Sequence, residues 1–354
     1  GSVTVSDGGT NSCSATLTAG AGSCTIDFPA AASYSMTGNY GGDSNFNGST
    51  SAVNSHTVNK ADTTTTITSD SPDSSTPGQS VTVNFSVSVT APGSGTPTGN
   101  VTVSDGTQSC TATVAAGQCD ITFTSAGAKT LTATYAGDSN FNGSTSAGEP
   151  HTVGKHATTT TITSDSPDPS LVGEAVTIQY SVSGGSSPTG NVTVSDGTQS
   201  CTATVAAGQC DITFTSAGAK TLTATYAGDT VNSGSASANE SHQVGSADVT
   251  VTITSDTPDP SSPSQLVTVD FTVTVNPPGV GTPTGNVTVS DGVDSCIGTV
   301  AAGTCNLTLT TSGARTLTAT YAGDSNFNGA ASAGESHTVD GTSPDVTINQ
   351  KAGQ

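Results

Sequence analysis

The stretch Val81-Thr-Val-Asn-Phe-Ser-Val-Ser-Val89 sets the fold class, because apolar and polar residues alternate in it without a break. Successive side chains of a β-strand point to opposite faces, so a period of two places the valines and Phe85 together on one face. Valine and phenylalanine also favour strands. The stretch therefore predicts an antiparallel strand with one face in a core and the other in water.

The sequence on either side continues this pattern in short runs. Turn dipeptides such as Asp105-Gly106 separate them. Besides the quoted stretch, the predicted strands lie at residues 63–69, 101–103, 110–114, 119–124, 131–135 and 151–153. About seven short strands in a unit of this size are typical of two antiparallel sheets packed face to face, an immunoglobulin-like (Ig-like) sandwich.

The chain repeats this unit. Residues 97–138 are identical to residues 188–229, and close variants start at Gly1 and Pro283. Such a long period indicates separate domains in series. The predicted boundaries are an incomplete module at 1–58, complete modules at 59–153, 154–244 and 245–339, and a tail at 340–354. We expect an all-β chain of tandem Ig-like modules that short linkers hold as an extended rod.

The first module is incomplete because Gly1 aligns with Gly99, so counterparts of residues 62–98 and their two strands are missing. A sandwich without these strands has an open core and an open sheet edge, which a foreign strand can complete. Residues 345–349 have a strand pattern, which makes Val346 and Ile348 candidates for donation. Two interpretations stay open: a fragment of a longer protein, or head-to-tail polymerisation by strand donation.

The charge balance excludes several classes of partner. Asp and Glu number 27 against 6 Lys and Arg, and the formal net charge is -21. Binding to nucleic acid needs clustered Lys and Arg, and so does binding to an anionic membrane surface. No apolar run of about 18 residues is present, so we predict no membrane insertion in this segment.

The cysteines form one local pair in each module: Cys13 with Cys24, Cys110 with Cys119, Cys201 with Cys210, and Cys296 with Cys305. Such pairs in an acidic chain predict structural disulfides and an extracellular or cell-surface location. The spacing is not Cys-x-x-Cys and no His lies near any pair, which disfavours zinc. We expect each bridge to clamp the hairpin of the fourth and fifth strands within one sheet.

Three segments of the second module, residues 63–70, 97–103 and 131–138, resemble the bacterial Ig-like domain repeats that occur in tandem in large surface proteins. The resemblance implies an extracellular stalk, adhesin or filament. We therefore predict a non-catalytic structural protein that requires no cofactor, with copies of itself or adjoining modules as partners. The alternative is an adhesin module that recognises glycans or a host surface through loops at the module ends.

A candidate calcium loop follows the sixth predicted strand. Residues 138–143 and Glu149 match the pattern D-x-[DN]-x-[DN]-G-x5-E, and the fourth module repeats it. The candidate ligands are Asp138, Asn140, Asn142, Glu149, Asp324, Asn326, Asn328 and Glu335. The other interpretation is a hairpin loop pinned by Phe141, because strands flank it and Val231 and Ser233 interrupt the pattern. A second calcium position, at module junctions, is suggested by the acidic pairs Asp70 and Asp73, Asp165 and Asp168, and Asp256 and Asp259. The other interpretation is that these are turn-forming Asp residues beside Pro.

Four histidines, His56, His151, His242 and His337, recur at the start of the final strand of each module. We interpret them as partly exposed strand residues. No module offers a His/Asp pair that plausibly serves one Ser, so no catalytic site is predicted.

Overall fold

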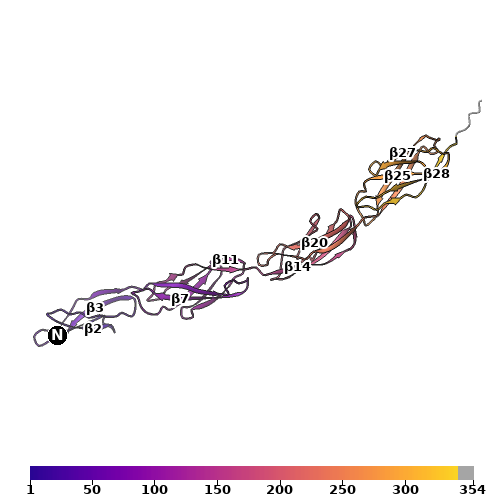
Figure 1. Ribbon diagram of the computed structural model, residues 1–354. Helices are drawn as coiled ribbons and strands as arrows, with labels where there is room; N and C mark the ends of the chain where they lie inside the picture. Colours follow the sequence, from indigo (N-terminus) through magenta and orange to yellow (C-terminus); the bar gives the residue numbers. More distant parts are fainter. Residues whose placement is uncertain (342–354) are drawn as a thin grey trace, which may run out of the picture. The chain divides into compact units, whose positions relative to one another are not determined.

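The computed structural model describes residues 1–341, and every regular element in that range is a β-strand. No helix in the described part is long and apolar enough to cross a lipid bilayer. The chain divides into two compact units, Gly1–His156 and Ala157–Gln354, which Figure 1 colours from indigo to yellow along the sequence. The predicted donor residues Val346 and Ile348 lie outside the described residues.

The second module, in the first unit, is a sandwich of two antiparallel sheets. A three-stranded sheet has the order β10-β7-β6, with β6 (Thr63–Ser71), β7 (Ser80–Val89) and β10 (Gln118–Thr122). The other sheet has the order β12-β11-β8-β9, and β13 also pairs with β11; its strands are β8 (Asn100–Ser104), β9 (Ser109–Thr113), β11 (Gly127–Tyr135), β12 (Ser144–Thr145) and β13 (Glu149–Val153). The predicted two-sheet sandwich is confirmed.

The core of this module lies between the two sheets. Val81, Val83 and Phe85 of β7 are buried, as the alternation in the quoted stretch predicts. They pack in one cluster with side chains of the facing sheet, among them Leu131 and Tyr135 of β11. The module therefore closes its own apolar interior.

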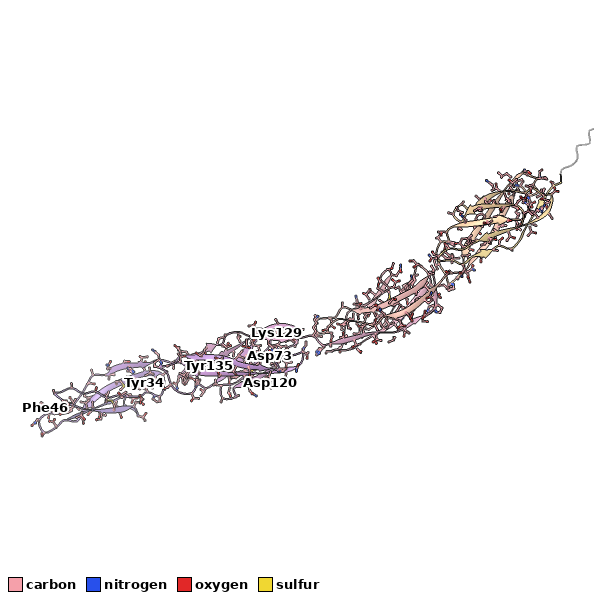
Figure 2. All side chains as sticks on the ribbon, in the orientation of Figure 1. Tyr34, Phe46, Asp73, Asp120, Lys129 and Tyr135 are labelled. Carbon is pink, nitrogen blue, oxygen red and sulfur yellow. A yellow bond between two sulfur atoms is a disulfide. The ribbon has the colours of Figure 1, made fainter. Side chains whose placement is uncertain are left out.

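The first module has one sheet only, in the order β2-β1-β3-β4 with β5 paired to β3. Its strands are β1 (Ser2–Ser6), β2 (Ser12–Thr16), β3 (Ala32–Tyr40), β4 (Ser49–Thr50) and β5 (Asn54–Val58). Residues 23–28, the counterpart of β10, form no strand because β10 needs β7 as its partner and this module has no such strand. Phe46, labelled in Figure 2, is 69% exposed, whereas Phe141 at the same repeat position is 5% exposed. The apolar face of this module is open in the described chain.

The second unit contains two further sandwiches, each with its own buried cluster. The third module comprises β14 (Thr158–Ser166), β15 (Ser170–Leu171), β16 (Ala175–Gly184), β17 (Asn191–Ser195), β18 (Ser200–Thr204), β19 (Gln209–Thr213), β20 (Gly218–Tyr226), β21 (Ser235–Ala236) and β22 (Glu240–Gly245). The fourth comprises β23 (Val249–Thr257), β24 (Leu266–Val275), β25 (Asn286–Ser290), β26 (Ser295–Thr299), β27 (Thr304–Thr308), β28 (Gly313–Tyr321), β29 (Ala330–Ala331) and β30 (Glu335–Val339). The repeated sequence thus folds into separate interiors.

All four local cysteine pairs are disulfide-bonded, as predicted. The bridges join Cys13 to Cys24, Cys110 to Cys119, Cys201 to Cys210, and Cys296 to Cys305. The further expectation, that each bridge clamps a hairpin within one sheet, is wrong. In the second module Cys110 lies on β9, which pairs with β8, whereas Cys119 lies on β10, which pairs with β7 in the other sheet. The bridge therefore crosses from one sheet to the other at the edge of the sandwich.

The other modules require the same correction. Cys210 lies on β19, which pairs with β16, and Cys305 lies on β27, which pairs with β24. Their partner cysteines lie on β18 and β26, in the opposite sheets. In the first module Cys24 lies in the segment that forms no strand, so no hairpin exists there for the bridge to clamp. In each complete module the fifth predicted strand pairs with the second predicted strand, in the opposite sheet from the fourth, and this places the bridge between the two sheets.

Candidate functional site

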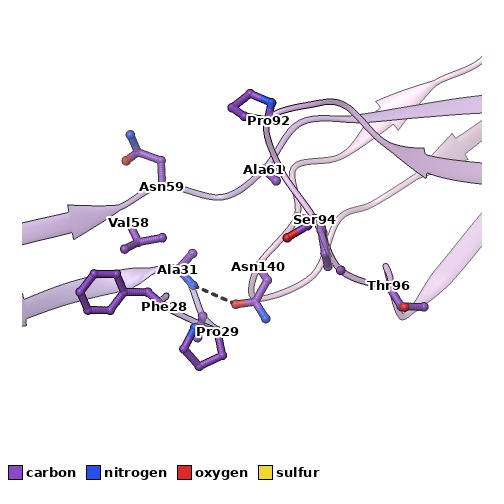
Figure 3. A pocket seen from close by; sticks show the side chains of 14 residues that line it. Phe28, Pro29, Ala31, Val58, Asn59, Ala61, Pro92, Ser94, Thr96 and Asn140 are labelled. Atoms are coloured by element: carbon purple, nitrogen blue, oxygen red, sulfur yellow. Dashed lines mark hydrogen bonds between the residues drawn. The ribbon is translucent and has the colours of Figure 1, made fainter. Parts of the chain in front are cut away.

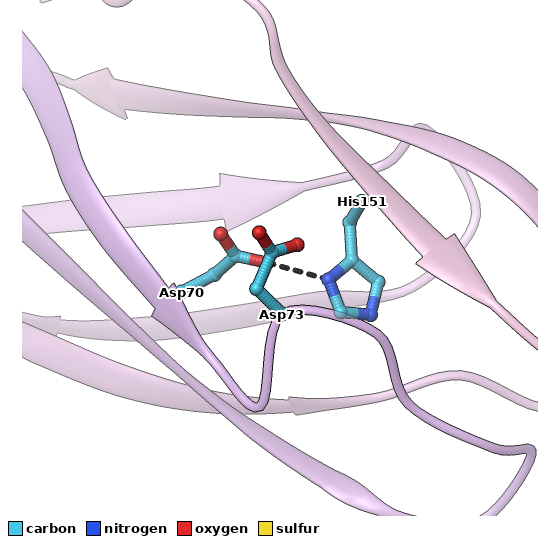
Figure 4. Close-up of side chains that lie close together, drawn as sticks. All are labelled: Asp70, Asp73 and His151. Carbon is cyan, nitrogen blue, oxygen red and sulfur yellow. Dashed lines mark hydrogen bonds and ion pairs between the residues drawn. The ribbon is translucent and has the colours of Figure 1, made fainter.

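Each complete module contains a buried chain of three polar side chains. In the second module His151 is hydrogen-bonded through Nδ1 to Asp70 and through Nε2 to Ser75 Oγ, the latter at 2.9 Å (Figure 4 shows the Asp70 contact). His151 is 2% exposed and Ser75 is 3% exposed. The ring of His151 also stacks on that of Phe123, with 5.1 Å between centroids.

The strand arrangement brings these distant residues together. Asp70 lies near the end of the first strand, Ser75 lies in the turn that follows, and His151 lies on the last strand of the module. The Ser75 N–H donates to the Thr152 carbonyl at 3.0 Å, and the Gly154 N–H donates to the Ser75 carbonyl at 2.8 Å. The turn is thereby added to the edge of the last strand, so the network joins the first strand of one sheet to the last strand of the other.

The same network recurs in the second unit. His242 Nδ1 lies 2.7 Å from Asp165 and Nε2 lies 2.8 Å from Ser170 Oγ. In the fourth module the partners of His337 are Asp256, at 2.6 Å, and Ser261, at 2.8 Å.

The structure corrects two expectations about these residues. The buried positions of His151, His242 and His337 show that their interpretation as partly exposed strand residues is wrong, because the first strand and its turn cover them. His56 is exposed, since the first module has neither that strand nor that turn. The second expectation, that no module has a His/Asp pair that serves one Ser, is also wrong. Each complete module places one Ser beside such a pair, although the His lies far from the Asp and the Ser in sequence.

The order of contacts is that of a Ser-His-Asp triad, but its surroundings differ from those of a hydrolase site. A nucleophilic hydroxyl must reach its substrate, and Ser75, Ser170 and Ser261 are only 3%, 1% and 1% exposed. Buried polar groups are costly unless they are paired, and each member of this network pairs the next. The arrangement therefore acts as a structural cross-link between strands.

A third carboxylate lies beside each histidine. The ligand atoms of Asp70, Asp73 and His151 lie within 4.8 Å of one another (Figure 4). A carboxylate only accepts hydrogen bonds, so Nδ1 of His151 carries the hydrogen that Asp70 accepts and has no lone pair free for a metal. In the fourth module Asp259 Oδ1 accepts the Thr338 N–H at 2.9 Å. Asp70 and Asp259 are thus engaged inside their own modules.

The candidate calcium loop is organised by hydrogen bonds to its first residue. Asp138 Oδ1 accepts the N–H groups of Asn140, at 2.8 Å, and Phe141, at 2.9 Å. Asp138 Oδ2 accepts the N–H and the hydroxyl of Thr98, at 2.8 and 2.7 Å. Although burial opposes the charge, these donors hold the pKa of Asp138 well below its usual range. An aspartate that caps its own turn in this way is typical of tight loops.

The other candidate ligands do not converge on one point. Glu149 lies on β13 opposite Leu131. The Asn142 side-chain N–H donates to Asp62 Oδ1 at 2.8 Å, and Asn328 donates to Asp248 Oδ1 at 2.8 Å. Asp62 and Asp248 lie in the linkers, the short segments that directly precede β6 of the second module and β23 of the fourth. Calcium binding stays a prediction, and an ion at this loop must displace the donors that hold Asp138.

The fourth module is expected to lose stability in acid through Asp324. Burial opposes the charge of this side chain, but donors from Asn326 and Thr284 outweigh burial and lower its pKa from 3.8 to about 2. The stabilisation is complete above the unfolded-state pKa and is lost as the pH falls through the folded-state pKa. An Asp324→Asn variant should melt below the wild type near neutral pH, and calorimetry should show this gap shrinking towards about pH 2. A gap that stays constant with pH would contradict the assignment.

One known protein family matches most of the chain. The family described as Bacterial Ig-like domain (group 3) matches residues 67–154, 162–254 and 254–340. No curated protein matches.

Several solved structures are similar to the chain. One is a tetra-tandem repeat from the extending region of a large adhesion protein, with 18% identity, a TM-score of 0.43, and coverage of 96% of this chain and 91% of that one. The Escherichia coli adhesin FdeC has 14% identity, a TM-score of 0.27, and coverage of 79% and 97%. A 1.5-MDa bacterial ice-binding adhesin has 18% identity, a TM-score of 0.27, and coverage of 79% and 96%.

Proposed function

The chain belongs to the bacterial Ig-like domain family (group 3), and from this premise we propose that it is a non-catalytic, extracellular stalk segment of an adhesin-type surface protein. The observation that carries the proposal is the repetition itself. Residues 97–138 recur without change at 188–229, and each complete module closes a separate core. A stalk needs repeated, self-contained units, and these near-identical copies supply them.

The disulfides support the extracellular part of the proposal. Every module carries one bridge, including the incomplete first module. Disulfides of this kind persist outside the reducing cytoplasm. The partners of such a segment are adjoining modules or further copies of the chain.

Removal of one module tests the stalk proposal. We expect deletion of residues 154–244 to leave the remaining modules folded and to shorten the particle by about 40 Å, since a strand residue adds about 3.3 Å. Small-angle X-ray scattering measures the maximum dimension, and calorimetry checks the remaining transitions. An unchanged dimension, or global unfolding, would argue against independent units that provide reach.

We also propose that strands from outside the described residues complete the first module, and that donation from a second copy links chains head to tail. The joint between the third and fourth modules supports this. There the Val280 N–H donates to the Val172 carbonyl at 2.9 Å, and Val172 lies in the turn between β15 and β16 of its module. The first module has no such turn.

The corresponding place at the joint between the first and second modules is an open pocket of about 380 Å³. Figure 3 shows its walls, which include Phe28, Pro29, Val58 and Pro92. A hairpin equivalent to residues 62–98 would cover the apolar face of the first module and place its turn in this pocket.

A synthetic peptide of residues 62–98 tests completion of the first module. We expect it to bind the full chain and to protect the amides of residues 23–28 from hydrogen exchange, because those residues gain the strand partner that β7 provides to β10. A peptide with Val81, Val83 and Phe85 replaced by Ser is the matched control. Equal protection by both peptides would refute completion.

Light scattering of the full chain tests whether the strands come from a second copy. Polymers that grow with concentration indicate donation by a second copy, and monomers at all concentrations exclude polymerisation.

A further inference from the structure

We infer that the loop at residues 138–143 and its counterpart at 324–329 are joint-setting loops, which hold the preceding linker and, through Asn140 and Asn326, the body of the preceding module. The inference deepens the proposed stalk function and rests on it only for its biological consequence. The contacts themselves lie inside each compact unit.

The first contact is between the loop and the linker backbone. The Ala61 N–H donates to the Asn140 carbonyl and the Asn142 N–H donates to the Ala61 carbonyl, both at 2.9 Å. Ala247 makes the same pair of bonds with Asn326 and Asn328, also at 2.9 Å. The linker therefore forms a short parallel bridge with the loop at both joints.

The second contact passes beyond the linker. Asn140 Oδ1 accepts the N–H of Ala31 at 3.0 Å, as the dashed line in Figure 3 shows. Asn326 Oδ1 accepts the N–H of Ala217, also at 3.0 Å. Ala31 and Ala217 lie next to the strands β3 and β20 of the preceding modules, so the amide reaches the module body. The same contact arises independently in both units.

Side chains of the loop complete the attachment. Asn142 donates to Asp62 of the linker, and Lys60 Nζ donates to the Asp138 carbonyl at 2.5 Å. Phe141 is buried against Gly95, where a Cβ would come within 3.0 Å of the ring and where φ is +119°. The position therefore requires glycine, because an added side chain would meet both the ring and an unfavourable backbone conformation.

The third module departs from this pattern in the loop and the linker together. Val231, Asn232 and Ser233 stand where the second module has Asn140, Phe141 and Asn142. In the linker before it, His156 and Ala157 stand where Ala61 and Asp62 stand before the second module. The counterparts of Asn142 and of its carboxylate partner Asp62 are thus replaced in the same module, by Ser233 and Ala157. This is expected if the two residues act as a pair.

Two attachment points constrain a joint more than one does. A linker held only by its own backbone bonds leaves the preceding module free to pivot about the linker. The hydrogen bond between Asn140 and Ala31 ties the loop to the preceding module itself and opposes that pivoting. The D-x-N-x-N-G pattern is thereby explained as a device that stiffens a stalk.

An Asn140→Val variant of the full chain tests the inference. Valine stands at this position in the third module, whose loop retains its turn around Asp229, so the substitution is compatible with folding. We expect exchange of the Ala31 amide to become about fivefold faster or more, since a net hydrogen bond contributes on the order of 1 kcal/mol. Spin labels placed on the first and second modules should show a broader distance distribution.

Two controls accompany this variant. Asn45→Val makes the same change at the equivalent position of the first module and should leave Ala31 exchange unchanged. The Ala217 amide, held by Asn326 in the same molecule, should keep its protection. Unchanged Ala31 exchange and an unchanged distance distribution in Asn140→Val would overturn the inference. Because neither readout measures reach or adhesion, failure of the stalk proposal would leave this result intact.

Discussion

Replacement of His151 by alanine is expected to lower the free energy of unfolding of the second module by about 3 kcal/mol or more. The change leaves the Asp70 carboxylate and the Ser75 hydroxyl buried without their partner, and an unpaired buried group costs about 1–3 kcal/mol, more when charged. It also removes the ring that stacks on Phe123. The network joins the first strand to the last. Local unfolding of the variant should therefore begin where β6 and β13 meet the turn at Ser75.

Calorimetry of the full chain measures this loss as a separate, lower-melting transition. Hydrogen exchange assigns it to the second module through the amides of Ser75 and Gly154, which form the bridge between the turn and the last strand. The chain provides its own control. His56 occupies the same repeat position but is exposed, so His56→Ala should change stability by less than about 0.5 kcal/mol. Equal effects of the two substitutions would show that the network contributes nothing.

Removal of the disulfide in the second module should be nearly as severe. The bridge joins residues nine apart, and the chain-entropy relation assigns a loop of this length about 2.6 kcal/mol. For a module of this size the loss corresponds to a fall in melting temperature of about 10–20 °C. Because Cys110 and Cys119 lie in different sheets, the variant also loses the covalent link between the sheet edges.

A double variant with Cys110→Ser and Cys119→Ser is compared with the wild type by thermal melting, with and without reductant. The matched control carries Cys13→Ser and Cys24→Ser, because this pair removes a bridge of similar span from the first module, where residues 23–28 form no strand. The control should leave the transition of the second module in place. Reductant should remove the difference between wild type and variant. A second module that melts as before without its bridge would contradict the assigned role.

The fold was largely predictable from local patterns. The alternation from Val81 to Val89 predicts a strand and its buried face, and turn residues such as Asp105-Gly106 mark where strands end. Repetition of the pattern predicts serial sandwiches, and the family match confirms the class. The pairing of Cys110 with Cys119 also follows from nearness in sequence.

The candidate sites were less predictable. The calcium pattern at Asp138 identifies the correct loop but not its contacts, because Ala31 and Asp62 lie far away in sequence. His151 has no neighbour in sequence that signals burial. A His that recurs in every complete module together with an Asp near the end of the first strand was the available signal, and it becomes informative only when the first and last strands are known to adjoin.

The amino-acid sequence by itself determined the strands, the faces they bury, the repeat and the cysteine pairs, since these depend on residues within a few positions of one another. Only the tertiary structure decided that Asp70 and Ser75 meet His151, that the disulfide crosses between sheets, and that Asn140 reaches Ala31. Each of these depends on which strands become neighbours when two sheets close over a core. Periodicity encodes which face of a strand is apolar, but not which distant polar group will lie beside it.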